Sequence, residues 1–239
     1  DGTFTGQRSM RRSSLPYSLN VADMNGDGYP DVVLPSSDNG NVVVADAPSF
    51  NAYRAYTAGV RPIASVVFDM NSDGRMDVVT ANSTARSITV LRGMGGGVLR
   101  RAFTFKLAVA PQAVAAGDVT RDGNPDVVVG TGSQTILLVG DGRGGFGESR
   151  ILRTLAGALM TEVVLGDFDG DGRLDLAALD RTNNRGYVML NNGSGLTYHA
   201  PFTVSATVHS IAMGDVNGDA RLDLVAASPS GANLLLGQP

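Results

Sequence analysis

Short apolar runs recur along the chain, and polar loops separate them at regular intervals. The most regular runs are residues 31–35, 77–81, 126–130, 175–179 and 223–227. Because each run is almost continuously apolar, it is typical of a strand buried on both faces. Another apolar run precedes the polar loop, as at 61–68 and 162–166. The pattern therefore predicts pairs of strands joined by a polar loop.

Two further strands are predicted in each unit. The third strands are expected at residues 42–45, 87–91, 135–139, 186–190 and 233–236. A Gly-rich turn follows and leads into a more polar fourth strand, expected at 103–107, 146–152 and 196–204. Units of four strands that repeat every 46 to 49 residues are typical of the blades of a β-propeller.

The chain ends suggest how such a ring closes. The fifth unit stops after its third strand, and the segment around Phe4 matches the turn and fourth strand around Phe146. We therefore predict an all-β fold, a β-propeller of five four-stranded antiparallel blades whose N-terminal strand closes the last blade. The single domain spans residues 1–239, with blades at about 15–60, 61–109, 110–157, 158–206, and 207–239 plus 1–14. The alternative is a segment of a seven-bladed ring.

The loop between the first two strands of each unit is a nonapeptide of pattern D-x-[D/N/T]-x-D-[G/A]-x-x-D. These five loops hold 16 of the 23 acidic residues, and carboxylates so close together repel one another. Calcium relieves the repulsion best, because it accepts six to eight oxygen ligands in flexible geometry. An EF-hand is excluded, since position 12 carries no acidic ligand and the flanks are β-rich. For any single copy, a metal-free Asp/Gly turn is the alternative.

Positions 1, 3, 5 and 9 are expected to offer side-chain oxygens, and position 7 a backbone carbonyl. The expected ligands are Asp23, Asn25, Asp27, Tyr29 and Asp31; Asp69, Asn71, Asp73, Arg75 and Asp77; Asp118, Thr120, Asp122, Asn124 and Asp126; Asp167, Asp169, Asp171, Arg173 and Asp175; and Asp215, Asn217, Asp219, Arg221 and Asp223. The fourth loop has four carboxylates and is expected to bind calcium most tightly.

These residues resemble the FG-GAP/VCBS repeat, the blade unit of integrin-α-like propellers. The matching elements are the small or aromatic residue before the first Asp, the Asp-Gly core, the Asp-Leu or Asp-Val exit, and the later Gly-rich turn. The resemblance covers essentially the whole chain and implies up to five Ca²⁺ ions, one per blade. Thr120 at position 3 and Ala220 at position 6 depart from the pattern. The family includes adhesion modules, lectins and domains attached to enzymes.

Composition limits the compartment and the partners. Five Ca²⁺ ions would change the formal net charge from −4 to +6. There is no cysteine and no apolar run of the ~18 residues that a membrane helix needs, so we expect no membrane insertion. Extracellular calcium modules bind at roughly 10⁻⁴–10⁻³ M, which favours an extracellular, secreted or cell-surface location, with the periplasm as the alternative. No leader is visible, so we read the chain as a mature product or an excised region.

Catalysis, sugar binding and partner binding are the three classes of function to weigh. The chain has two histidines, two glutamates, no cysteine and no phosphate-binding loop, and none forms a recognisable catalytic motif, so we expect no enzyme. A carbohydrate-binding lectin stays open, although there is no tryptophan. We favour a binding, adhesion or assembly module; its partner is a protein or a glycan, self-assembly stays open, and no nucleic acid is expected. A non-catalytic domain of a secreted enzyme is the remaining alternative.

Overall fold

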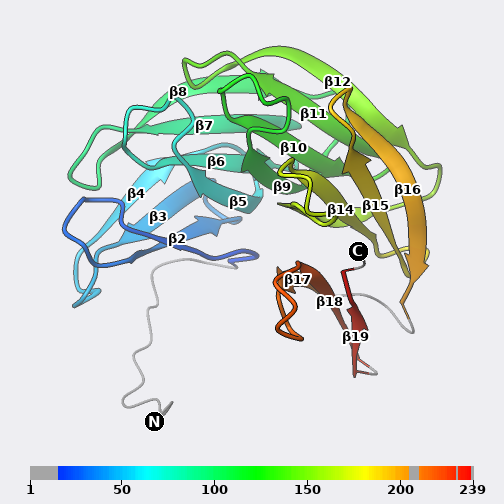
Figure 1. The fold of residues 1–239 in the computed structure, drawn as a ribbon. Helices are drawn as coiled ribbons and strands as arrows, with labels where there is room; N and C mark the ends of the chain where they lie inside the picture. Colours follow the sequence, from blue (N-terminus) through cyan, green and yellow to red (C-terminus); the bar gives the residue numbers. More distant parts are fainter. Residues whose placement is uncertain (1–15, 205–209, 230, 238–239) are drawn as a thin grey trace.

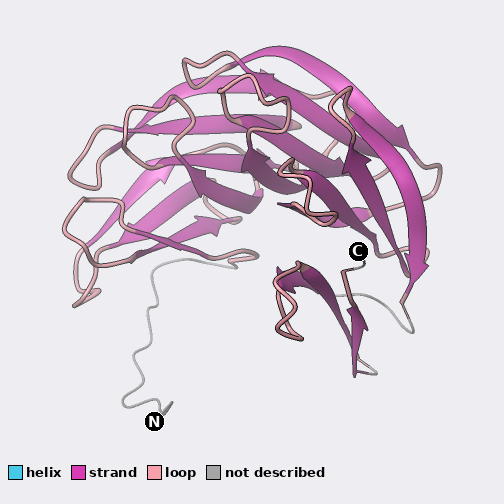
Figure 2. Cartoon of the chain, in the orientation of Figure 1, coloured by secondary structure: helices cyan, strands magenta, loops and turns pink. Residues whose placement is uncertain are grey.

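The computed structural model describes residues 16–204, 210–229 and 231–237, and these residues form only strands and loops (Figure 2). Five antiparallel sheets lie one after another along an arc, with the first and the last sheet at its two ends (Figure 1). We call the sheets blades 1 to 5 in chain order. This confirms the predicted all-β architecture of repeated blades. In the described part of the chain there is no helix that could cross a membrane.

Within each blade the strands pair in chain order. The first strands are β1 (Asn20–Ala22), β5 (Pro62–Phe68), β9 (Pro111–Gly117), β13 (Met160–Gly166) and β17 (Ser210–Gly214). The second strands are β2 (Asp31–Ser36), β6 (Asp77–Asn82), β10 (Asp126–Thr131), β14 (Asp175–Asp180) and β18 (Asp223–Ser228). The third strands are β3 (Asn41–Ala45), β7 (Ser87–Gly93), β11 (Gln134–Gly140), β15 (Arg185–Asn191) and β19 (Gly231–Leu235). The fourth strands are β4 (Tyr53–Thr57), β8 (Leu99–Lys106), β12 (Phe146–Thr154) and β16 (Leu196–Thr203).

Blade 5 has three strands among the described residues, β17, β18 and β19. Its predicted fourth strand, formed by residues 1–14, lies outside the described residues. Closure of the ring through that strand therefore stays a prediction.

The predicted second strands begin where expected, at the last Asp of each nonapeptide, and run one residue further. The prediction for the fourth strand of blade 2 was wrong at its start, because β8 begins at Leu99 and not at residue 103. Arg100 and Arg101 pair with β7 beyond a register shift between Val90 and Leu91. The sequence prediction relied on apolar positions, so two adjacent arginines were not assigned to the strand. Backbone pairing does not depend on side-chain polarity, and the strand therefore includes them.

The hydrophobic core is divided among the seams between neighbouring blades. Four clusters of buried residues each combine side chains from two consecutive blades. At the seam between blades 2 and 3, the Phe146 ring meets the edges of Phe103 and Phe105, with centroids 6.0 and 6.1 Å away. Each Val or Leu buried in this way contributes roughly 1.5–3 kcal/mol. A blade is thus stabilised by its neighbours as well as by its own sheet.

Candidate metal centre

Each nonapeptide connects the first strand of a blade to the second, as predicted. In blade 4, for example, β13 ends at Gly166 and β14 begins at Asp175, so that Asp167, Asp169 and Asp171 lie in the loop between them. The same placement holds for all five copies. The structure therefore brings the predicted ligands of each loop together within one turn of chain.

The Asp at position 1 organises the loop from its N-terminal end. Its two oxygens accept the backbone N–H groups of positions 5 and 6 at 2.7–3.2 Å in every copy. These bonds stabilise the ionised form, and the N–H groups of Gly28 and Ala220 hold the pKa of Asp23 and Asp215 below its usual range.

Positions 3 and 5 make shorter-range contacts. The position 5 carboxylate accepts the N–H of position 7 at 2.8–3.0 Å in all five loops. At position 3, Asn25, Asn71, Asp169 and Asn217 accept the N–H of position 5. Thr120 differs, because its buried hydroxyl accepts no N–H of the loop and instead lies near the Asp126 carboxylate, where it opposes the rise in the pKa of Asp126. The lone pairs of this hydroxyl oxygen leave it able to contact a cation.

The Asp at position 9 is fully buried in every blade. One of its oxygens accepts the N–H of position 2, and the other accepts an N–H just beyond or at the end of the third strand, at 2.7–3.0 Å. The second donors are Ala47, Gly93, Gly140, Asn191 and Gly237. This side chain therefore ties the loop to two strands of its own sheet.

These second donors were not predicted from the sequence. They stand 14 to 16 residues after the position 9 Asp, and three of the five are glycines in or beside the Gly-rich turn. That nearly constant offset was the signal that could have revealed them.

The backbone conformation explains the residue at position 6. Its φ is positive in all five loops, from +79° to +86° at the glycines and +65° at Ala220. The expectation of positive φ is confirmed. Position 4 also has positive φ, including at Ser72 and Arg121, where no glycine relieves the strain.

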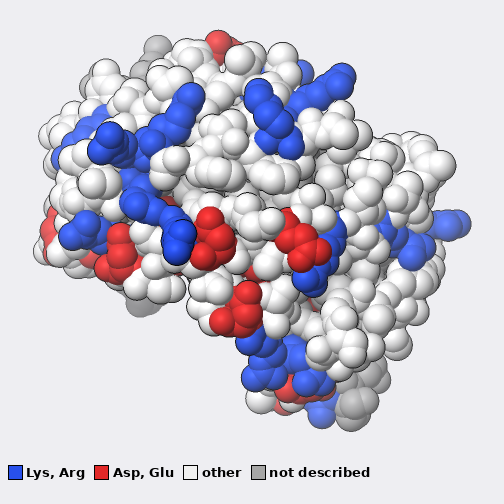
Figure 3. Space-filling model, turned by 90° about the horizontal axis from the view of Figure 1, so that it is seen from above, with Lys and Arg blue, Asp and Glu red and all other residues white. Residues whose placement is uncertain are grey.

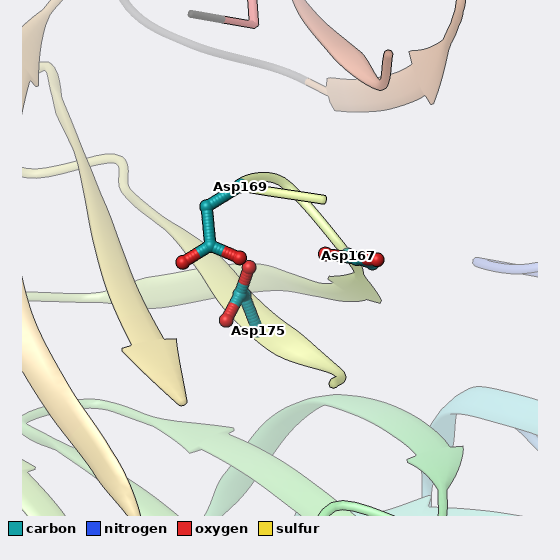
Figure 4. Close-up of side chains that lie close together, drawn as sticks. All are labelled: Asp167, Asp169 and Asp175. Atoms are coloured by element: carbon teal, nitrogen blue, oxygen red, sulfur yellow. The ribbon is translucent and has the colours of Figure 1, made fainter. Parts of the chain in front are cut away.

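One loop gathers three carboxylates especially closely. One oxygen from each of Asp167, Asp169 and Asp175 lies within 4.8 Å of the others, the only such cluster found among the described residues (Figure 4). Asp171 is not part of the cluster, and it forms an ion pair with Arg173. The sequence singled out this loop for its four carboxylates.

Burial is the largest cause of the altered acidity at position 9. It raises the pKa of Asp77, Asp126 and Asp175, and neighbouring aspartates of the same loop raise it further. The N–H groups that bind these carboxylates oppose the rise without cancelling it. The sequence predicted that repulsion between carboxylates alone raises their pKa, whereas at position 9 the loss of solvent raises it more. A bound cation would offset both effects.

The donor set fits a hard divalent cation. Each carboxylate can accept about four hydrogen bonds or metal contacts, and the loop N–H groups occupy only part of this capacity. Asp167, Asp169 and Asp175 would hold the ion in the fourth loop, and the residues at the corresponding positions would do so in the others.

Comparisons with known proteins agree with the repeat. The FG-GAP-like repeat matches residues 69–129, 119–178 and 167–226, and the FG-GAP repeat matches residues 15–45. The search of curated protein sequences finds no match.

Solved structures show the same fold at low sequence identity. A lectin of Agrocybe aegerita that recognises non-reducing terminal N-acetylglucosamine is 19% identical, with a TM-score of 0.64 over 93% of this chain and 63% of the lectin. BBS1N, in complex with ARL6DN, is 14% identical, with a TM-score of 0.68 over 98% of this chain and 69% of its own. Virginiamycin B lyase from Staphylococcus aureus is 14% identical, with a TM-score of 0.64 over 98% and 74%. The chain thus spans less than two thirds of the lectin, and these likenesses concern the fold alone.

Proposed function

The chain belongs to the FG-GAP repeat family, and we propose that it is a calcium-stabilised binding module that works outside the cell. The observation that carries the proposal is the fourth loop, where the carboxylates of Asp167, Asp169 and Asp175 converge on one another and Asp175 is partly desolvated. When bound, calcium would supply the positive charge that these carboxylates lack.

The residues of the loop have distinct parts in this proposal. Asp167 orders the loop backbone, Asp169 adds the carboxylate that the other loops lack at position 3, and Asp175 connects the site to β14 and β15. A bound calcium ion would therefore hold the loop rigidly against its own sheet. Binding modules gain affinity when their surface loops are ordered before the partner arrives.

Calcium removal tests the proposal. We expect the melting temperature of the chain to fall when EGTA replaces millimolar calcium. A site for which the calcium concentration is ten times the Kd adds about 1.4 kcal/mol to the free energy of unfolding. The measurement is a thermal unfolding series over calcium concentration. An unchanged melting temperature in EGTA would refute calcium stabilisation.

A matched pair of variants locates the effect. Asp169→Asn gives the fourth loop the same residue type as three of its counterparts, so we expect the tightest calcium step to weaken and not to vanish. Asp141→Asn is the control, since Asp141 lies outside the nonapeptides and accepts N–H groups in the turn between β11 and β12. Equal losses in both variants would contradict the assignment of the metal to the loop.

A catalytic role finds no support in the two glutamates. Glu148 is exposed and paired with Arg150 at 2.8 Å, and Glu162 accepts the N–H of Ile211. The two lie on different strands, β12 and β13. We therefore propose a non-enzymatic module.

A lectin is the second candidate. The fold is shared with a sugar-binding protein, and the rings of Tyr187 and Tyr198 lie 6.3 Å apart, with the Arg153 guanidinium 3.8 Å above Tyr198. Sugar-binding sites use such aromatic faces, although Arg153 covers this one. A glycan array read with calcium and again with EGTA decides: calcium-dependent signals that Tyr198→Ala removes would support the lectin, and an array without signals would reject it.

A further inference from the structure

The seam between blades 2 and 3 holds a groove of about 390 Å³ with an unusual concentration of cationic side chains. Arg92 of β7, Arg100 of β8, and Arg143 of the turn between β11 and β12 line it. Arg101 of β8 also borders it, but its guanidinium donates to the backbone oxygens of Thr57 and Ala58 in blade 1. No residue of the five nonapeptides does so, and a site in this groove is therefore independent of the proposed function.

Two of these arginines oppose each other directly. Arg92 and Arg100 are partners in the antiparallel register of β7 and β8. Like charges in this arrangement destabilise a sheet. The Arg92 guanidinium donates one bond to the backbone oxygen of Arg143, but its Nε is buried and has no partner among the described residues. The groove therefore has both a repulsion and an unsatisfied donor.

No carboxylate in the described part of the chain forms an ion pair with these arginines. The ion pairs found there involve Arg54, Arg150 and Arg173, none of which lines the groove. Asp141, the one acid at the groove, has an oxygen that accepts the N–H groups of Arg143 and Gly145. Most other acids are confined to the nonapeptides.

We propose that this groove binds a sulfate or carboxylate group carried by an anionic polysaccharide. A planar guanidinium donates two parallel hydrogen bonds to such groups, and arginines from two blades converge here. A nucleic acid fits less well, because Phe103 is the one aromatic lining residue and offers no platform for successive bases. On the face shown in Figure 3, Lys and Arg side chains lie in separate groups and not in one continuous stripe.

The test compares two charge-matched double variants by calorimetric titration. Arg100→Gln/Arg143→Gln removes two groove cations, and Arg181→Gln/Arg185→Gln removes two exposed cations of blade 4. With a heparin hexasaccharide as the sulfated probe and an oligogalacturonate as the carboxylated probe, we expect about tenfold weaker binding in the first variant and less than about twofold in the second. The better of the two probes identifies the group.

Three outcomes would overturn the proposal. They are the absence of binding to both probes at low salt, equal losses in the two double variants, and binding of duplex DNA as tight as that of the oligosaccharides with the same loss in the groove variant. The last would assign the groove to nucleic acid.

Stability without ligand separates binding from a structural role. Because Arg92 and Arg100 repel each other, Arg100→Gln is expected to melt no lower than the unmodified chain. Added inorganic sulfate is expected to raise the melting temperature of the unmodified chain more than that of Arg100→Gln/Arg143→Gln, because sulfate stabilises both by exclusion from the surface and only the first by binding. A lower melting temperature for Arg100→Gln would show that this arginine supports the fold, against the proposal.

Discussion

At the scale of single residues, the five nonapeptides assign a separate task to each position. Position 1 gathers the loop N–H groups, position 6 reverses the chain, and position 9 anchors the loop to its sheet. The division recurs in five copies that differ at most other positions. The loop backbone is therefore ordered mainly by its own side chains and joined to the sheet at position 9.

Ala220 is a residue at which the loop backbone is strained. Its φ of +65° is disfavoured for a residue with a Cβ, and the other four loops have glycine there. We expect Ala220→Gly to stabilise the chain by about 0.5–1 kcal/mol, measured by chemical denaturation. Ala55→Gly, at an exposed position of β4 that pairs with Val43, is the control and is expected to destabilise. A loss of stability in both variants would contradict the strain at position 6.

At the scale of elements, the Gly-rich turns connect neighbouring blades. In blade 2 the turn approaches blade 1, where the Tyr56 hydroxyl donates to the Gly97 oxygen at 3.0 Å and Gly97 N–H donates to the Met24 oxygen at 3.1 Å. In blade 4, the Asn191 amide donates to the Val119 oxygen of the preceding blade at 2.8 Å. In these two cases the turn of one blade thus supports the nonapeptide of the blade before it.

Asn191 offers a test of this support. It is 3% exposed, and its removal would leave the Val119 oxygen without this donor, so we expect Asn191→Ala to cost about 1–3 kcal/mol. Calcium binding by the third loop, which contains Val119, should weaken as well. Asn192→Ala is the control, since the exposed Asn192 bonds only within the turn, to Ser194. Denaturation and calcium titration of both variants make the comparison, and similar stabilities would exclude a role between blades.

Glu162 connects the first strands of blades 4 and 5. Burial raises its pKa above the ordinary 4.5, while the Ile211 N–H and the Ser210 hydroxyl oppose the rise. A raised pKa in the folded state means that the ionised carboxylate lowers stability at neutral pH. This loss disappears as the pH falls below the folded pKa and towards the unfolded one.

We therefore expect Glu162→Gln to raise the melting temperature at about pH 7 and to change it little near pH 4. Gln keeps the oxygen that accepts the Ile211 N–H. Glu148→Gln is the matched control, because Arg150 lowers the pKa of Glu148 at an exposed site. Thermal unfolding from pH 4 to 8 measures both. A Glu162→Gln variant that is less stable at neutral pH would contradict the expectation.

At the scale of the whole molecule, the two end blades differ from the middle ones. Val21 of β1 is 57% exposed, and in blade 5 Met213 and Leu234 are 44% and 50% exposed. In the middle blades, seams on both sides bury the inner strands. The end blades thus present apolar side chains that the predicted five-bladed closure would bring together.

Closure can be measured by cross-linking, because the chain contains no cysteine. If the ring closes with five blades, Val21→Cys and Met213→Cys in one chain should react with a short bismaleimide to give an intramolecular cross-link. Val21→Cys with Ile151→Cys is the control, since Ile151 lies on the exposed fourth strand of blade 3. A ring with more blades would keep Val21 and Met213 apart and leave both pairs unlinked.

Local features explain what could be predicted. The apolar second strands, the nonapeptides between strands and the positive φ at position 6 all follow from neighbouring residues, because most of the bonds that shape each loop backbone stay within the nonapeptide. The blade repeat and the candidate ligands were therefore accessible from the sequence. The start of β8 was not, since two arginines masked a strand that backbone pairing defines.

The loops, the order of strands within a blade and the number of repeats in the chain could all be derived from the amino-acid sequence. The side chains through which neighbouring blades touch could not, as in the contacts of Asn191 with Val119 and of Glu162 with Ile211, 72 and 49 residues apart. Folding also placed Arg92 opposite Arg100 and brought Arg143 to them from the next blade. The pairing of Arg92 with Arg100 depends on the register of β7 and β8, and the contacts between blades depend on how one sheet stacks on the next. No local pattern of residues records that stacking.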